Sequence, residues 1–452
     1  MFDRQNSALL SDLYQLTMLQ GYVEQRLYGT AVFEFFVRKL PPDRNFLLAL
    51  GLEQAIEYLE KLHFSEQELS WLADREQFSA EFIEYLAGFR FMGDVDAMPE
   101  GAVFFPNEPI LRVTAPLPQA QFVESRLINL FHFQTLIGSK AVRSALAAPG
   151  KLLVDFGMRR AHGAEAGLLS ARATYLAGFS GSATTLAGAL WDIPVYGTMA
   201  HSFIQAHDDE AEAFLRFAVA NPKDVTLLID TYDTEQGARK VVSLAEELRR
   251  RKIPIRSVRL DSGDLAEHAR RVRRILDEGG LQATTIFASG NLDETKVAEL
   301  VACGAPIDGF GIGTLVDVSA DAPYLECAYK LEEYAGKPRR KHSEGKATWP
   351  GCKQVYRTYD SQDRLLSDCV ALASDPQPGE PLLVPVMRGG RRVSPPIPLA
   401  DLRIRTSHNV QRLPDRLKAL SPAEPYAVQI SPSLQTLAKT MDEQMAATAK
   451  RG

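Results

Sequence analysis

A cycle of short apolar strand, polar loop and amphipathic helix repeats through the middle of this chain. Strands are predicted at 152–156, 225–229, 255–260, 284–288 and 308–312, and helices at 235–251, 265–278 and 293–303. The last four strands begin about 25 to 30 residues apart, which is typical of βα units that build a parallel sheet. The periodicity alone leaves open whether the sheet closes into a barrel or stays a doubly wound layer.

The sequence on either side of this cycle follows other patterns. The first part combines a helix at 12–24, capped by Ser11, with an alternating strand at 31–38 and helices rich in aromatic and acidic residues, as in an α+β domain. Beyond Gly336 the chain is rich in proline and basic residues and ends in a helix at 433–447. We predict an N-terminal domain at 1–130, an α/β domain at 131–335 and a loop-rich C-terminal segment at 336–452.

The composition excludes several classes of partner. With 57 acidic and 51 basic side chains the net charge is −6, so nucleic acid is not expected as the main partner, although a local patch for a small anion remains possible. The longest uncharged run, 173–191, contains glycines and hydroxyl residues, which indicates a buried helix and loop rather than a membrane span. No secretion signal is evident, and the four cysteines lack metal-site spacing. We expect a cytoplasmic protein with reduced thiols.

Polar residues follow each predicted strand. They occupy 155–160, 230–233, 261–264, 289–291 and 313–314. In parallel α/β architectures the loops at the carboxyl ends of the strands converge on one rim, where ligands bind. The five loops are therefore predicted to form one site.

Two of these loops have the composition of a phosphate or sugar-phosphate site. A sugar phosphate could bind at the end of one strand, where Arg259, Asp261 and a glycine turn follow one another. An ion pair at the edge of the strand, with Asp264 capping the next helix, explains the same residues equally well. Gly313 and Thr314 would bring backbone amides to a phosphate, and the alternative is a tight turn.

Other candidate residues depend on their surroundings. His201 would act as a nucleophile if a carboxylate such as Asp230 or Glu165 oriented its imidazole, but the segment alone favours a structural histidine. Phe156 could stack on a flat anionic ring that pairs with Arg159. More often, such a phenylalanine packs in the core and such an arginine pairs at the surface.

Taken together, eight segments resemble the nicotinate phosphoribosyltransferase family. In chain order they are DLYQLTM, DFGMRR, GTMAHS, LIDTYDT, VRLDSGD, ASGNLD, GFGIGT and KHSEGKATWPGCK. They extend over residues 12–353, and eight ordered segments are far more specific than any one of them. The resemblance implies an irregular α/β barrel of the type II phosphoribosyltransferase kind, with an N-terminal α+β domain completed by the C-terminal segment.

The resemblance also implies a reaction. That family condenses nicotinate with phosphoribosyl pyrophosphate to nicotinate mononucleotide and pyrophosphate in NAD biosynthesis and salvage, and couples the step to ATP hydrolysis through a phosphohistidine. Magnesium would accompany the pyrophosphate groups, and its protein ligands stay unassigned. A homodimer is implied, because Tyr14 would reach the site of the partner subunit.

The resemblance assigns a role to each candidate residue. His201 would be phosphorylated and Asp230 would orient it, while Asp261 would face the ribose diol. Tyr14 and Phe156 would enclose the pyridine ring. Arg259 and Thr198 would hold the substrate carboxylate, and Arg159 would lie beside the ring or the phosphate. Gly313 and Thr314 would bind the 5-phosphate.

The choice of substrate and the rival functions rest on further residues. Segment 181–185 contains no carboxylate to repel an acid, which favours nicotinate over nicotinamide. The alternatives are a type II phosphoribosyltransferase for nicotinamide or quinolinate and an aldolase-like phosphosugar barrel, although no predicted strand ends in the lysine that a Schiff base needs. A non-catalytic binding module would rest only on the basic segment 337–357.

Overall fold

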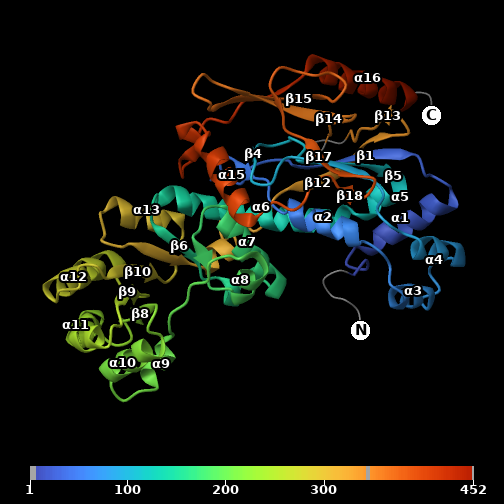
Figure 1. Ribbon diagram of the computed structural model, residues 1–452. Helices are drawn as coiled ribbons and strands as arrows, with labels where there is room; N and C mark the ends of the chain where they lie inside the picture. The colour runs from blue at the N-terminus through green and yellow to red at the C-terminus, as the bar shows by residue number, and fades with distance from the viewer. Residues whose placement is uncertain (1–6, 343–346, 450–452) are drawn as a thin grey trace. The chain divides into compact units, whose positions relative to one another are not determined.

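The computed structural model describes residues 7–342 and 347–449, and its chain divides into two compact units. One unit combines the chain up to Leu136 with the chain from Tyr324 onward, and the other is Ile137–Pro323. The N- and C-terminal segments thus build one unit together, as the resemblance implied (Figure 1). Residues 343–346 of the basic segment lie outside the described part of the chain.

The unit 137–323 contains the strands and helices of the repeated cycle. Its strands are β6 Leu152–Asp155, β7 Gly181–Ser182, β8 Val225–Leu228, β9 Ile255–Leu260, β10 Thr285–Ser289 and β11 Gly309–Ile312. Its helices are η1 Met158–Arg160, α7 Ala164–Leu176, α8 Thr185–Trp191, α9 His201–Gln205, α10 Glu210–Ala220, α11 Thr234–Arg250, α12 Leu265–Glu278, α13 Glu294–Ala302 and α14 Thr314–Asp317, with the end of α6 Glu124–Ala147. The predicted strands and helices of this unit are confirmed, since their ends differ by no more than about one residue.

The six strands form one parallel sheet in the order β7-β6-β11-β10-β9-β8. This order would be a closed ring in chain order if β7 also paired with β8, so the sheet is a barrel that stays open between those two strands. A parallel bridge from Ser182 to Val195 extends the sheet at the β7 edge. The predicted irregular barrel is therefore confirmed, and the chain between β7 and β8 carries α8, α9 and α10.

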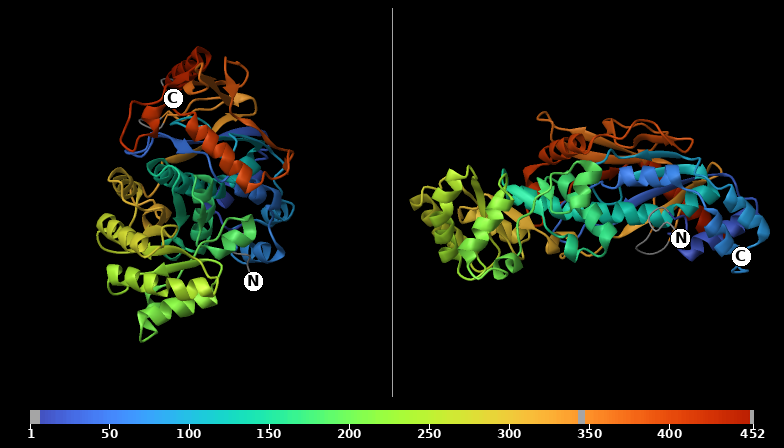
Figure 2. Two further views of the ribbon diagram at one scale, coloured as in Figure 1. Left: turned by 60° about the vertical axis from the view of Figure 1, so that its left-hand side comes forward. Right: turned by 60° about the horizontal axis from the view of Figure 1, so that its bottom comes forward.

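Helices α11, α12 and α13 each follow an aspartate at the N-cap position, and each has a buried apolar side. Asp233, Asp264 and Asp293 accept hydrogen bonds from backbone amides in the first turns of α11, α12 and α13. In α11 the buried positions include Val241 and Leu248, seven residues and two turns apart. Helices α11 and α12 lie next to each other beside β8 and β9 (Figures 1 and 2).

The other unit is α+β. Its strands are β1 Thr30–Val37, β2 Leu47–Leu48, β3 Asp94–Ala97, β4 Val103–Phe104, β5 Leu111–Pro116, β12 Cys327–Tyr334, β13 Lys337–Pro338, β14 Lys353–Tyr359, β15 Leu365–Leu372, β16 Glu380–Pro381, β17 Val384–Arg388, β18 Arg391–Arg392 and β19 Val428–Ile430. Its helices are α1 Leu13–Glu24, α2 Leu52–Lys61, α3 Glu66–Ala73, α4 Ala80–Ala87, α5 Leu117–Phe122, the start of α6, α15 Leu399–Gln411, η2 Asp415–Lys418 and α16 Pro432–Ala449. The predicted cap at Ser11 is wrong, because Asp12 holds the N-cap position of α1.

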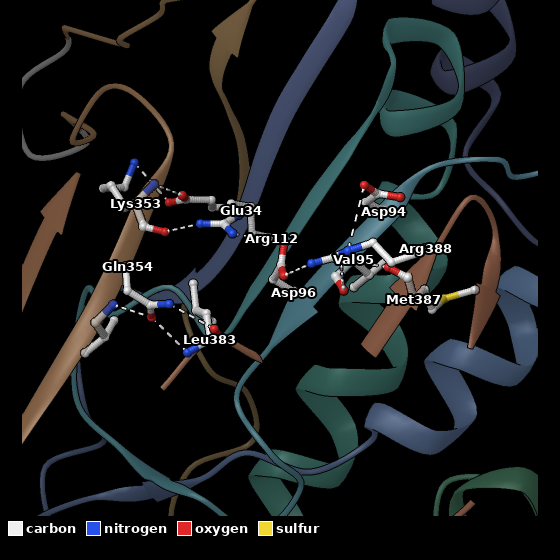
Figure 3. A network of polar contacts seen from close by, with 11 residues as sticks. Glu34, Asp94, Val95, Asp96, Arg112, Lys353, Gln354, Leu383, Met387 and Arg388 are labelled. Atoms are coloured by element: carbon white, nitrogen blue, oxygen red, sulfur yellow. Dashed lines mark hydrogen bonds and ion pairs between the residues drawn. The ribbon is translucent and has the colours of Figure 1, made fainter. Parts of the chain in front are cut away.

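Charged side chains, most of them buried, join the early and late parts of the chain in this unit (Figure 3). Lys353 on β14 lies 2.9 Å from the carboxylate of Glu34 on β1, and both side chains are buried. The carbonyl of Lys353 accepts a hydrogen bond from Arg112 on β5, and Arg112 pairs at 2.9 Å with Asp96 on β3. Asp96 in turn pairs at 2.6 Å with Arg388 on β17. The N-terminal strands are thus bonded to two strands of the C-terminal segment.

None of the helices within 7–342 and 347–449 combines the length and apolar character needed to cross a bilayer.

Candidate active site

Loops at the carboxyl ends of β6, β9, β10 and β11 line one cavity of about 430 Å³. Its lining includes Phe156, Arg159, Arg160, Arg259, Asp261, Ser289, Asn291, Gly313 and Thr314. Four of the five polar loops that the sequence singled out therefore face the same cavity. The fifth loop, 230–233, contacts a residue of the lining, because Asp230 accepts a hydrogen bond from the backbone amide of Asp261.

Arg259 is the centre of the hydrogen-bond network in this cavity. Its Nη2 donates to Asp261 Oδ1 at 2.8 Å and its Nε donates to Ser289 Oγ at 2.8 Å. Its Nη1 donates to Thr198 Oγ1 and to the carbonyl of Met199, both at the longer distance of 3.3 Å. The guanidinium is thus held on three sides, and the long Nη1 contacts can be exchanged for a better acceptor at small cost.

Asp261 is held as an anion by its neighbours. Burial acts to raise the pKa of Asp261, but the hydrogen bond from Ser289 and the charges of Arg259 and His201 outweigh it, so the pKa lies below its usual value. Its backbone amide donates to Asp230 Oδ2 at 2.8 Å, and Ser262 Oγ donates to the same oxygen at 2.7 Å. Asp230 therefore fixes the loop in which Asp261 lies.

Phe156 supplies an aromatic face beside the guanidinium. The carbon Cζ of Arg259 lies 5.4 Å from the centre of the Phe156 ring, and the ring of Phe287 lies 5.7 Å from it. A Cβ atom at Gly313 would come within 2.7 Å of the Phe156 carbonyl, so only glycine allows the loops after β6 and β11 to approach this closely. A flat ring next to a cation is the arrangement that an aromatic acid requires.

His201 begins α9 at the edge of this network. Its Nδ1 lies 3.1 Å from Thr231 Oγ1, and its Nε2 lies 3.9 Å from Asp261 Oδ2. The partner of Nδ1 is thus Thr231 in place of the expected Asp230, because Asp230 turns its carboxylate toward the amide of Asp261. About 40% of the His201 side chain is exposed, so the imidazole can meet a substrate.

The remaining predicted residues fall into two groups. Arg159 and Thr314 line the cavity, and Thr198 contacts Arg259. Tyr14 belongs to the other unit, where it lies on α1 with 46% of its surface exposed. Arg256, three residues before Arg259, lies near the other end of β9 and contacts Asp224 at 3.8 Å.

Sequence reasoning missed three residues of this site. Ser289 binds both Arg259 and Asp261, Thr231 contacts His201, and Arg160 lines the cavity. Each lies in a polar loop that was recognised at the end of a strand. Within those loops no local pattern separates Thr231 from Asp230, because the choice depends on which side chain points toward the imidazole.

Comparison with known proteins agrees with this architecture. Residues 9–132, 152–348 and 379–438 match, in order, the nicotinate phosphoribosyltransferase N-terminal domain, the nicotinate phosphoribosyltransferase family and the nicotinate phosphoribosyltransferase C-terminal domain. A nicotinate phosphoribosyltransferase of Mycobacterium tuberculosis is 48% identical over 414 residues, which cover 91% of this chain and 89% of that protein. The chain belongs to the nicotinate phosphoribosyltransferase family.

Two further relatives place the chain within this family. A nicotinate phosphoribosyltransferase of Bacillus subtilis is 41% identical over 364 residues, covering 79% of this chain and 74% of that protein. The crystal structure of human nicotinic acid phosphoribosyltransferase superposes with a TM-score of 0.86 at 29% identity, covering 95% of this chain and 99% of that one. The family models for the N- and C-terminal domains match segments of one unit, and the central model overlaps the open barrel.

Proposed function

We propose that this chain condenses nicotinate with phosphoribosyl pyrophosphate to give nicotinate mononucleotide and pyrophosphate, a step of NAD biosynthesis and salvage. The observation that carries the proposal is the pairing of Arg259 with the Phe156 ring at a cavity lined by polar loops. The relatives named nicotinate phosphoribosyltransferase support it. An assay for nicotinate mononucleotide from the two substrates, with and without ATP, tests it, and turnover of nicotinamide at a comparable rate would refute the choice of the acid.

The roles of the residues follow from the charges that the reaction develops. Departure of pyrophosphate leaves an oxocarbenium-like ribose carbon, so the enzyme must hold the pyridine nitrogen close to that carbon and exclude other nucleophiles. In this proposal Phe156 and Tyr14 enclose the ring, and Arg259 with Thr198 binds its carboxylate. The anionic Asp261 accepts hydrogen bonds from the ribose hydroxyls, and Gly313, Thr314 and Arg159 receive the phosphate groups.

We assign the coupling to ATP to phosphorylation of His201. Its imidazole is partly exposed, and Thr231 holds Nδ1, which fixes the ring while the other nitrogen faces Asp261. Transfer of the γ-phosphoryl group forms an N–P bond on the imidazole and releases ADP. The new charge beside Asp261 would reorganise the loop that binds the sugar substrate, and so change its affinity.

Retention of labelled phosphate tests this assignment. The protein is incubated with γ-labelled ATP, and the acid-labile label on the chain is counted for wild type, His201→Ala and His207→Ala. His207 is a matched control because it lies six residues away and its Nδ1 contacts the carbonyl of Phe203 at 2.8 Å. We expect label on wild type and His207→Ala only, and equal label on His201→Ala would show that another residue is modified.

Magnesium, the dimer and the compartment complete the proposal. Within the described residues, no group of three or more histidine, cysteine, aspartate or glutamate side chains is placed to hold a metal ion. The residues therefore do not fit a dedicated metal cage, and we propose magnesium only as a companion of the pyrophosphate groups. We further propose a homodimer with Tyr14 supplied by the partner subunit. The four cysteines are free, which is typical of the reducing cytoplasm in which we expect the protein to act.

A further inference from the structure

Two buried carboxyl groups lie beneath the candidate active site. Asp155 is the last residue of β6 and Asp317 is the last residue of α14, the short helix after β11. Each is only 1% exposed. Strands β6 and β11 are neighbours in the sheet, and Ile312 pairs with Asp155. The two carboxyl groups therefore lie under two adjacent loops of the cavity, one beginning with Phe156 and the other with Gly313.

The partners of the two groups differ. Asp155 Oδ1 accepts a hydrogen bond from the amide of Gly157 at 2.8 Å, and its Oδ2 accepts one from Ser182 Oγ at 2.7 Å. Both carboxyl oxygens of Asp317 are buried. If Asp317 is ionised, neither oxygen has a hydrogen-bond donor among the described residues. Asp155 is the neighbour within hydrogen-bonding reach of Asp317. Two ionised carboxylates cannot bond to each other, but one protonated group can donate to the other.

Close packing brings Asp317 against the loop after β6. A Cβ atom at Gly157 would lie 2.2 Å from Asp317 Cγ, so glycine at this position is what admits the carboxyl group. Gly157 thus donates its amide to one member of the pair and packs against the other. Phe156 and the arginine turn that follows are attached to this point of the chain.

Electrostatics decides which group holds the proton. Burial, and then the charge of Asp155, raise the pKa of Asp317 well above its usual value. Burial also raises the pKa of Asp155, but the hydrogen bonds from Ser182 and Gly157 favour its ionised form. Both shifts favour a pair that shares one proton over a pair of ionised carboxylates, as expected for two carboxyl groups in one dry site.

We propose that Asp317 is a positioning residue whose carboxylic acid donates a hydrogen bond to Asp155 and so fixes the Phe156 loop to the Gly313–Thr314 turn. The inference rests on the proposed function, since it is these two loops that we assign to the pyridine ring and to the phosphate. Neither Asp155 nor Asp317 is among the described residues that line the cavity. The pair sets the separation between the two loops, and hence between the two reactants.

Two substitutions separate this role from simple packing. Asp317→Asn keeps a donor, because its amide N–H can bond to Asp155, whereas Asp317→Leu keeps the volume and removes the donor. We expect KM for both substrates to stay within about threefold of wild type in Asp317→Asn and to rise about tenfold or more in Asp317→Leu, with a smaller change in kcat. Asp277→Leu is the matched control, since its carboxylate is about half exposed on α12 and pairs with Arg273.

An infrared measurement tests the shared proton without relying on activity or on the leucine variant. A buried carboxylic acid has a carbonyl band separate from the carboxylate bands, and the wild-type minus Asp317→Asn difference spectrum in D₂O should contain that band. The proposal is overturned if the band is missing, or if Asp317→Asn raises KM as much as a folded Asp317→Leu does. If wild type makes no nicotinate mononucleotide but the band is present, the proposed function fails while the shared proton stands.

Discussion

Replacing Arg259 by glutamine removes the charge on which the choice of an acid substrate depends. The guanidinium has a side chain only 14% exposed and already holds Asp261, Ser289 and Thr198, so a substrate carboxylate would bind a fixed and partly dry cation. A hydrogen bond to a charged group contributes about 1.5 to 3 kcal/mol. Loss of one such bond to the substrate therefore lowers kcat/KM for nicotinate by about 10- to 150-fold. Displacement of Asp261 adds to this loss.

Steady-state kinetics at neutral pH measures the effect, with each substrate varied in turn. The pKa of Asp261 lies below its usual value in the wild type, so this carboxylate stays ionised at neutral pH and its protonation does not contribute. Arg249→Gln is the control, because that side chain is 63% exposed on α11 and pairs with Glu246 three residues away; we expect a change within about twofold. A KM for nicotinate in Arg259→Gln within threefold of wild type would mean that the carboxylate binds elsewhere.

Three further perturbations follow from the described contacts. Mixing Tyr14→Ala with His201→Ala protein should restore activity that neither has alone, because a mixed dimer contains one intact site if Tyr14 acts in trans. Glu294→Ala removes the carboxylate that Lys140 and Arg143, two buried cations of α6, share. It should lower the free energy of unfolding, measured in urea, by about 3 kcal/mol or more. The control Glu299→Ala removes an exposed carboxylate and should change that free energy by under about 0.5 kcal/mol. Burial raises the pKa of Glu332 from 4.5 to about 8, so between these pH values the folded state keeps a proton that the unfolded chain has lost. The contribution of Glu332 to the free energy of unfolding therefore falls as the pH rises from 4.5 to about 8. Glu332→Gln should flatten that slope, by as much as about 1.4 kcal/mol per pH unit.

The strands and helices of the open barrel could be predicted from the sequence because they depend on local patterns. Runs such as Val225–Leu228 are apolar and short, and they are separated by helices with a buried stripe and an aspartate at the start. Both signals are read over fewer than twenty residues. The order of the strands, and the break between β7 and β8, depends on contacts between segments more than 100 residues apart, as between β6 and β11. Periodicity carries no information on such pairing. The family resemblance supplied an irregular barrel, but neither the strand order nor the place of the break.

The polar network of the site could be predicted only in part for a related reason. Arg259 and Asp261 stand two residues apart on the end of one strand, so their side chains point to the same side and their contact follows from strand geometry. The contact of His201 with Thr231 joins residues 30 apart, and that of Asp155 with Asp317 joins residues still farther apart in the sequence. For these pairs the direction of each side chain in space decides the partner.

The charge of the cavity resolves an apparent conflict between the composition and the substrates. The chain as a whole carries a net charge of −6, yet both proposed substrates are anions. Three arginines and one aspartate are the charged residues of the cavity lining, which gives a local charge of 3 − 1 = +2. The shared proton of Asp155 and Asp317 contributes to the same end, because a second ionised carboxylate beneath the Phe156 loop would oppose that field at short range. In the proposed function, this local excess of positive charge, together with a neutral member of the buried carboxyl pair, allows an acidic protein to bind a carboxylate and a pyrophosphate in the same cavity.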